Sequence, residues 1–353
     1  MVAYTVSFFQ KPDSYGEYSS FVLGADVGGT HIKIGIAGVK HENPVLLFSI
    51  NFKSKDITDP HLIFMESLAY AKREFNISVC CGCIGAAGVI SEDSEKARLT
   101  NLPWTIDCRI IREQIELSDL FVINDFQIMG YGINTVNPMN TNDVLSIKPG
   151  AKDSLRSPRI VIGAGTGLGK CLLIFDEVRN RYAPLASEGG HADLPIYSSV
   201  EQDLVVFIQQ RYGQSFPVTY EQVLSGEGLM NIYRFLSTQQ TGHQDLLIQT
   251  PEDISKYRND DMLCKKTFEL FMNFYARCIK NYVLDTMALG GVFIAGGIAI
   301  KNSDLFQSSD FIDEMNNVFQ RNDILRQVPV YLIRNPHVSL QGACLAAIEK
   351  KLK

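Results

Sequence analysis

The sequence predicts an α/β protein built from two related domains. The chain has 353 residues, 46% of them apolar, which is enough for a large core and two domains. Two apolar runs, FVLGADVGGTHIKIGIAG (21–38) and RIVIGAGTGLGKCLLIFD (159–176), each enter a glycine-rich turn and leave it with strand periodicity. Residues 134–158 between them are rich in Asn, Pro, Ser and Gly and form the predicted domain boundary.

The elements expected in the N-terminal half alternate between strand and helix. Residues 1–20 are predicted to be a flexible polar extension, and the first glycine hairpin follows. Strand VLLFSINF, amphipathic helix 60–75, a buried strand within SVCCGCIGAAGVI and strand 121–126 come next. This order predicts a mixed sheet with helices packed on it.

Helices dominate the pattern after the second hairpin. They are expected over 199–212, 228–236 and 260–289, the last with an apolar face at helical spacing. Thr250 is expected to cap a short helix that begins with Pro251. Residues 290–300 are predicted to be a strand and a glycine turn that leads into a helix, and the chain is predicted to end in a helix.

Composition excludes several classes of function. The 33 Lys and Arg against 39 Asp and Glu give a net charge of -6, so nucleic acid is not an expected partner. No apolar segment is long enough to span a membrane, and the first residues do not resemble a secretory signal. A cytoplasmic protein with reduced thiols is therefore expected. The cluster of Cys80, Cys81 and Cys83 is interpreted as core packing rather than a metal site.

The first glycine turn is expected to approach a phosphate. A Rossmann site or P-loop runs from strand into helix, whereas this turn runs from strand to strand. Gly28 and Gly29 let the backbone approach an anion, and Thr30 can donate its hydroxyl. Asp26 would repel phosphate unless Mg²⁺ lies between them, directly or through water. The alternative is an ordinary hairpin whose Asp bonds its own backbone.

The second turn repeats this device. Gly165, Thr166 and Gly167 follow an apolar strand and precede another. The repeat favours phosphate binding over a plain hairpin, and it suggests two half-domains that hold one polyphosphate.

Asn124 and Asp125 follow an apolar strand, where ligands bind in α/β sheets. Asp125 could act as a general base that accepts the proton of an attacking hydroxyl during phosphoryl transfer. The competing interpretation is a helix N-cap.

Glu188 and His191 flank two glycines, and together they offer a hydrogen-bond acceptor and donor to sugar hydroxyls. A metal site would need a third ligand at a matching spacing, which the sequence does not show. Glu221, considered alone, would be a solvated helix residue.

These segments carry a resemblance to a known family. The chain resembles the bacterial-type glucokinases, ATP-dependent sugar kinases of the actin-like ATPase and hexokinase superfamily. The matching segments occur in the family's order from about residue 21 to 353: GADVGGT, NLPW, VINDF, VIGAGTGLG, EGGHADLP, EQVLSGEGLMNIY and GGVFIAGGI.

The resemblance implies a two-domain actin-like ATPase (ribonuclease H-like) fold with a central cleft. A small domain would comprise 21–135 plus 335–353, and a large domain 136–334. The implied reaction is phosphorylation of D-glucose by ATP with Mg²⁺, the first step of glycolysis. Domain closure would expel water. A homodimer is compatible with this interpretation.

The resemblance also implies residue roles. Asp125 corresponds to the catalytic base, and the other sugar-binding positions are Asn124, Glu188, His191 and Glu221. The nucleotide-binding positions are Asp26, Gly28, Gly29, Thr30, Gly165, Thr166, Gly167, Gly296 and Gly297. No structural zinc is expected, because the chain has no cysteine between Cys171 and Cys264.

The chain departs from the family pattern at His31, Lys170, Glu227 and residues 192–195. His31 and Lys170 affect the expected nucleotide contacts, and 192–195 affects the expected sugar preference. Two alternatives remain open: a kinase for another hexose or amino sugar, and a non-catalytic sugar sensor of the same fold.

Overall fold

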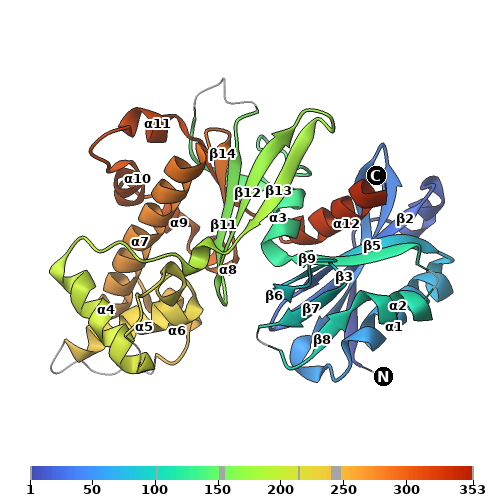
Figure 1. Ribbon diagram of the computed structural model, residues 1–353, viewed down its shortest axis with the longest axis horizontal. Coiled ribbons are helices and arrows are strands. Elements are labelled where there is room, and N and C mark those ends of the chain that lie inside the picture. The colour runs from blue at the N-terminus through green and yellow to red at the C-terminus, as the bar shows by residue number, and fades with distance from the viewer. Residues whose placement is uncertain are drawn as a thin grey trace. The chain divides into compact units, whose positions relative to one another are not determined.

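A computed structural model describes residues 2–100, 102–115, 117–150, 156–213, 215–239 and 248–351 (Figure 1). Asn101 of the NLPW segment and residues 151–155 of the predicted boundary lie outside this description. The chain forms two compact units. Unit 1 contains Met1–Asn137, Asp176–Ala186 and Asn335–Lys353, and unit 2 contains Pro138–Phe175 and Ser187–Arg334. Residues 176–186, which the sequence analysis places in the large domain, group with unit 1.

Unit 1 is built on a mixed six-stranded sheet of order β1-β4-β3-β2-β5-β9. Its strands are β1 (Tyr4–Phe8), β2 (Phe21–Val27), β3 (His31–Lys40), β4 (Asn43–Lys53), β5 (Val79–Ala86) and β9 (Asp119–Asn124). β2, β5 and β9 are parallel, and the other neighbours are antiparallel. Because β1 pairs with β4 at the sheet edge, the flexible extension expected before residue 21 is wrong for this segment.

Helices cover both faces of this sheet (Figure 1). The helices α1 (Pro60–Phe75) and α2 (Cys108–Gln114) bury one apolar cluster, and α3 (Asp125–Ile133) and α12 (Val338–Lys351) bury another. Cys81 and Cys83 belong to the second cluster, so core packing is confirmed for these two. A small sheet joins β6 (Gly88–Ile90), β7 (Lys96–Leu99) and β8 (Thr105–Asp107).

A second six-stranded sheet has the order β10-β15-β14-β11-β12-β13, and most of its strands belong to unit 2. Its strands are β10 (Val144–Lys148), β11 (Arg159–Ala164), β12 (Leu168–Asp176), β13 (Arg181–Ser187), β14 (Gly291–Ala295) and β15 (Val330–Ile333). β13, apart from Ser187, lies in the 176–186 segment that groups with unit 1. β11 and β12 form the expected glycine hairpin. β10 lies inside the predicted boundary segment 134–158, so part of that segment is a strand of this sheet and not a linker.

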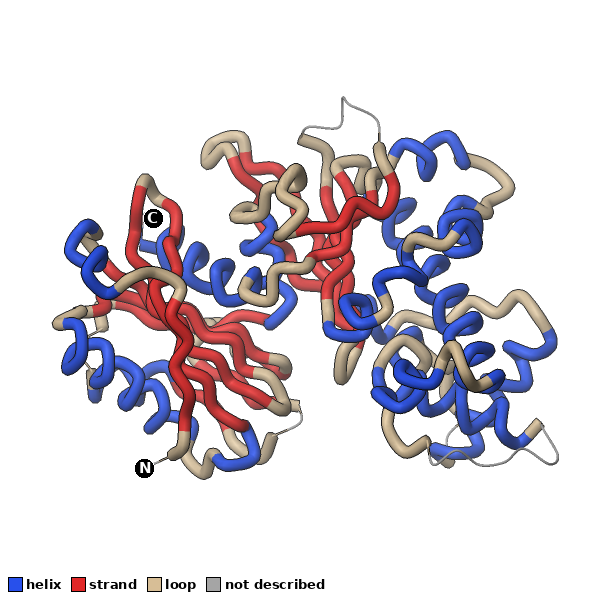
Figure 2. Tube along the Cα trace, turned by 180° about the vertical axis from the view of Figure 1, so that it is seen from behind, coloured by secondary structure: helices blue, strands red, loops and turns tan. Residues whose placement is uncertain are grey.

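The helices of unit 2 lie beside this sheet (Figure 2). Together they bury one large apolar cluster. They are α4 (Ser199–Tyr212), α5 (Gly226–Thr238), α6 (Pro251–Tyr257), α7 (Met262–Thr286), α8 (Gly297–Lys301), α9 (Ser303–Phe306), α10 (Ser309–Asn316) and α11 (Asn322–Gln327). The predicted Thr250 cap is confirmed, because its side chain accepts a hydrogen bond from the Asp253 N–H. Throughout the described residues, no helix combines the length and apolarity that a membrane crossing requires.

Candidate active site

The parallel strands of unit 1 bring the first glycine turn and Asp125 to one edge of the sheet. Val27 at the end of β2 pairs with Ala86, and Ala86 pairs with Asn124 at the end of β9. Neighbouring strands are about 4.8 Å apart, so Val27 and Asn124 are separated by roughly 10 Å. The register thus gathers the turn and the Asn-Asp pair at the edge where α/β sheets bind ligands.

Hydrogen bonds from Ser54 hold the first glycine turn in place. The Ser54 hydroxyl donates to the Gly28 carbonyl at 2.8 Å, and the Ser54 N–H donates to the Thr30 carbonyl at 3.0 Å. The Gly28 N–H donates to the His31 carbonyl at 3.0 Å. Gly29 and Thr30 remain exposed at the tip, where a ligand can reach them.

Asp26 lies beside this turn in a partly desolvated position. Its Oδ2 accepts a hydrogen bond of 2.6 Å from the Ser339 hydroxyl on α12. Burial raises the pKa of Asp26 above its usual value, against the lowering effects of the Ser339 bond and the Lys33 charge. A nearby cation would therefore stabilise the carboxylate.

The donor set at Asp26 fits Mg²⁺ held mainly by phosphate and water. Among the described residues, no three His, Cys, Asp or Glu side chains gather closely enough to hold a metal by themselves. Mg²⁺ commonly binds one or two carboxylates together with substrate phosphates, so a single Asp beside a phosphate turn suits it.

Asn124 and Asp125 form the N-terminus of α3. The Asn124 Oδ1 accepts hydrogen bonds from the N–H groups of Phe126 (2.8 Å) and Gln127 (3.3 Å). The Asp125 Oδ1 also accepts from Phe126, at 2.9 Å. The capping alternative therefore applies to Asn124 first, while Asp125 holds the first helical position, where the helix dipole stabilises a carboxylate.

The second glycine turn is bound directly to Glu221. The turn closes through a 2.8 Å bond from the Gly165 N–H to the Gly167 carbonyl. The Glu221 Oε2 accepts the Leu168 N–H at 2.8 Å, and a Cβ at position 167 would lie only 2.5 Å from that oxygen. Glu221 is therefore tied to the turn, and the solvated helix residue expected from its sequence position alone is wrong.

A short backbone pairing brings the Glu188–His191 segment to Glu221. The Tyr220 N–H donates to the Ala192 carbonyl at 3.0 Å, and the Leu194 N–H donates to the Val218 carbonyl at 2.9 Å. His191 and Glu221 line one cavity of about 340 Å³. The structure thus unites the sugar-binding residues expected in the second half of the chain.

Both Glu188 and His191 face solvent. Their side chains are 78% and 61% exposed, with 3.9 Å between Glu188 Oε2 and His191 Nε2. Two exposed groups of opposite hydrogen-bonding character at this distance can serve neighbouring sugar hydroxyls.

Lys170, a departure from the family pattern, is buried beneath this segment. Only 4% of it is exposed, and its Nζ lies 4.8 Å from the ring centre of Tyr220 and 5.2 Å from that of Tyr282. Its Cδ lies 3.0 Å from the place a Cβ would occupy at Gly189. One side chain therefore connects β12, the glycines before His191 and the residue that precedes Glu221.

A cavity of about 460 Å³ opens beside the second turn. Its lining includes three residues expected to bind nucleotide, and the complete set is Gly165, Thr166, Gly226, Glu227, Pro251, Glu252, Ser255, Gly297, Ile298 and Lys301. Gly296, the residue before Gly297 of this lining, has a φ of 96°. A Cβ at position 296 would lie 2.5 Å from the Ala164 carbonyl oxygen.

The sequence interpretation missed Gly226 and Lys301 in this lining. The Gly226 N–H donates to the Gly165 carbonyl at 2.8 Å, which joins α5 to the turn. The paired glycines of SGEG at the start of α5 were the available signal for Gly226. Lys301 carried no signal, because a lysine at the end of a helix is common.

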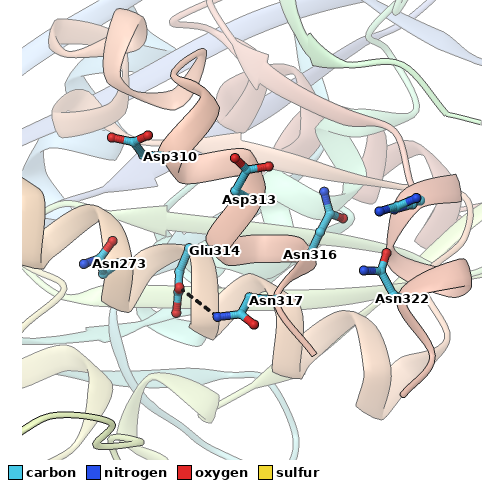
Figure 3. Close-up of a pocket in the computed structure, with 8 residues that line it drawn as sticks. Asn273, Asp310, Asp313, Glu314, Asn316, Asn317 and Asn322 are labelled. Carbon is cyan, nitrogen blue, oxygen red and sulfur yellow. Dashed lines mark hydrogen bonds between the residues drawn. The ribbon is translucent and has the colours of Figure 1, made fainter. Parts of the chain in front are cut away.

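A larger cavity of about 630 Å³ lies elsewhere in unit 2 (Figure 3). Polar side chains around α10 line it, including Asp310, Asp313 and Glu314, and the Asn317 amide donates to Glu314 at 3.4 Å. None of the expected site residues lines this cavity. Its size alone therefore does not make it the active site.

The glucokinase family profile matches residues 23–350. The chain belongs to the glucokinase family. A glucokinase from Trichormus variabilis is 29% identical over 93% of this chain and 99% of its own length. Among solved structures, glucokinase from Balamuthia mandrillaris in complex with glucose has a TM-score of 0.80 at 20% identity, covering 93% of each chain.

A ROK family glucokinase from Streptomyces griseus, in complex with glucose and AMPPNP, has a TM-score of 0.65 at 18% identity. It covers 94% of this chain and 100% of its own. The actin-like ATPase fold expected from the sequence is confirmed. Family membership makes the chain an enzyme that phosphorylates glucose.

Proposed function

We propose that the chain transfers the γ-phosphoryl group of ATP to the 6-hydroxyl of glucose. The observation that carries this proposal is the bond between Glu221 and the second glycine turn. It places a group suited to sugar hydroxyls against a backbone suited to phosphate, within unit 2 alone. Donor and acceptor groups are adjacent, as a transfer reaction requires.

The nucleotide is proposed to occupy the cavity of about 460 Å³. Gly165, Thr166 and Gly167 would contact its phosphates, and Gly296 and Gly297 would lie near the nucleoside. Gly28, Gly29 and Thr30 are also proposed to contact phosphate. The binding of AMPPNP by the Streptomyces griseus relative supports ATP as the donor.

Asp125 is proposed to act as the general base. It would accept the proton of the glucose 6-hydroxyl as that oxygen attacks the γ-phosphorus. The bond between the γ-phosphorus and the bridging oxygen of ADP would break, and ADP would leave with the electron pair. Asn124, Glu188, His191 and Glu221 would hold the remaining hydroxyls.

Asp26 is proposed to hold Mg²⁺, directly or through water. The ion would neutralise phosphate charge. We also propose a cytoplasmic location, because all eight cysteines are free thiols, which is typical of reducing compartments.

Replacement of the base tests this assignment. Asp125→Asn keeps a polar side chain of similar size, so glucose binding should persist while turnover falls by about 10²–10⁴, the usual contribution of a general base. A coupled assay of ADP release gives turnover, and calorimetry gives glucose affinity. Asp13→Asn, at an exposed position of unit 1, controls for the lost charge. Unchanged turnover in Asp125→Asn would overturn the assigned role.

The same assay with glucose, mannose, fructose and glucosamine tests the sugar. Glucose should give the highest kcat/KM. A clearly higher value for another sugar would replace glucose as the assigned substrate, and no ADP release with any of them would favour the sensor interpretation.

A further inference from the structure

A β-bulge in β5 brings two neighbouring thiols together. Phe21 of β2 pairs with Val79, and Val22 pairs with Cys81, so Cys80 is the extra residue of the bulge. Adjacent side chains in a regular strand point to opposite faces, but a bulge redirects one of them. As a result, the Sγ atoms of Cys80 and Cys81 lie only 3.5 Å apart.

Cys80 differs from the other cysteines in its exposure. All eight cysteines lie in the described part of the chain, and Cys80 is partly exposed while the other seven are buried. The Lys351 Nζ, on the last turn of α12, lies 3.5 Å from the Cys80 Sγ. A partly exposed sulfur beside an ammonium group is the setting in which protein thiols become reactive.

The neighbouring groups favour a thiolate at Cys80. A hydrogen bond from Cys81, followed by the charge of Lys351, lowers the pKa of Cys80 to about 6, although burial opposes the shift. The same Cys80–Cys81 bond and burial raise the pKa of Cys81, so Cys81 keeps its proton.

Two further contacts oppose this ionisation. The Phe21 carbonyl lies 3.2 Å from the Cys80 Sγ and accepts only from its thiol form. The Ala347 carbonyl, 3.7 Å from the Cys81 Sγ, competes for the proton of Cys81. The charge of Asp119 also raises the pKa of Cys81. Asp119 forms an ion pair with Lys350 at 3.3 Å.

We propose that Cys80 is a site of covalent modification by hydroperoxides and soft electrophiles. With hydrogen peroxide, the Cys80 sulfur attacks one oxygen, so that an S–O bond forms and the O–O bond breaks. The departing hydroxide takes a proton from a buffer acid or a neighbouring acidic group. The sulfur is oxidised to a sulfenic acid, and the peroxide is reduced to water.

This site is separate from the proposed active site within unit 1. Cys80 lies near the start of β5, whereas Ala86 at its end marks the edge that carries Asn124. Six residues of extended strand span about 20 Å. Cys80→Ser is therefore expected to retain basal glucokinase activity, and the modification can be tested whether or not the proposed catalytic roles hold.

Limited alkylation of the folded, full-length protein tests the proposal. Substoichiometric iodoacetamide at neutral pH, followed by mass spectrometry of all eight cysteines, should label Cys80 first. An ordinary thiol is only roughly 3% ionised at pH 7, so the rate advantage of a thiolate is readily measured. Hydrogen peroxide followed by a 1,3-diketone trap for sulfenic acid should give its adduct at Cys80.

Matched variants separate reactivity from simple exposure. Lys351→Met should slow alkylation of Cys80 about tenfold, because it removes the cation that stabilises the thiolate. Lys350→Met is the control, since its ammonium pairs with Asp119 instead. Cys81→Ala should also slow the reaction, and Cys81→Ser, which restores a donor, should recover part of the rate.

Two results would overturn the proposal. One is labelling of any other cysteine ahead of Cys80 in the folded protein. The other is a Cys80 rate that neither Lys351→Met nor Cys81→Ala changes, which would show that exposure alone governs it. Lys351 is exposed, so Lys351→Met is expected to fold, and its thermal midpoint checks this.

Discussion

The Lys170 side chain is buried, and its Nζ lies beside the rings of Tyr220 and Tyr282 and the thiol of Cys278. Removing an ammonium from water is costly unless other groups compensate. The faces of Tyr220 and Tyr282 contribute to this compensation, at about 2 kcal/mol for a desolvated cation–π contact. The same contacts fix Tyr220 next to Glu221, so the charge contributes to positioning the sugar-binding segment.

Lys170→Met is therefore expected to raise the KM for glucose about tenfold, by analogy with the loss of one or two cation–π contacts. Methionine preserves the apolar stem, so the KM for ATP and the kcat should change much less. Lys148→Met is the matched control, because Lys148 is also buried in unit 2 but donates to the Leu325 carbonyl at 2.6 Å. Equal effects of both variants on the glucose KM would argue for a general loss of stability.

The buried Asp26 carboxylate is expected to destabilise the folded state, while its proposed role is to hold Mg²⁺. Its raised pKa means that the folded state disfavours the ionised carboxylate. This penalty is fully present above the folded pKa and vanishes below the unfolded pKa, near 3.8.

Asp26→Asn is accordingly expected to raise the thermal midpoint at neutral pH while lowering ADP release. Asparagine can still accept the Ser339 hydrogen bond. The gain in midpoint should shrink as the pH falls towards the ordinary Asp value of 3.8, which scanning fluorimetry across a pH series would detect. A gain that grows on acidification would contradict the sign derived from the pKa.

At the scale of elements, glycines let α3 and α12 cross in close contact. A Cβ on Gly342 would lie 1.9 Å from the Ile128 carbonyl oxygen and 2.4 Å from the Gly132 nitrogen. Both of these atoms belong to the backbone of α3 and cannot rotate away. The spacing of the two helices therefore depends on Gly342, and α3 carries Asp125 at its first position.

Gly342→Ala should force the two helices apart and displace Asp125. The expected cost is about 1–3 kcal/mol of stability, as for other overpacked cores, together with a fall in kcat. Thermal unfolding and the ADP assay would measure both effects. Gly16→Ala serves as the control, because a Cβ there has no heavy atom of the described residues within 4 Å.

Capping residues and apolar periodicity predicted most of the helices. Some strands were not predicted, because the sequence does not show which distant strands they pair with. Helices 60–75 and 199–212 have the predicted bounds, because Asp59 and Ser198 cap their starts and left-handed residues end them. β1 and β10 were missed, since both are short and are defined by partners far away in sequence. α3 was considered only as the helix that an N-cap at Asp125 would start, because its glycines obscure a helical pattern.

At the scale of the whole molecule, the chain passes between its units more than once. Unit 1 is assembled from three segments and unit 2 from two. Asn134 explains why 176–186 groups with unit 1: its amide donates to the Tyr182 carbonyl at 2.9 Å and accepts the Tyr182 N–H at 2.8 Å. No composition change marks this segment, so the sequence could not reveal the exchange.

The sequence by itself determined the two glycine hairpins, the position of Asp125 after a buried strand and the family. These features depend on residues that are close along the chain, and local geometry limits what they can form. The tertiary structure alone decided that Glu221 holds the second turn, that Ser339 bonds Asp26 and that Lys351 reaches Cys80. Those pairs are 53, 313 and 271 residues apart, and only the packing of whole elements brings such distant side chains together.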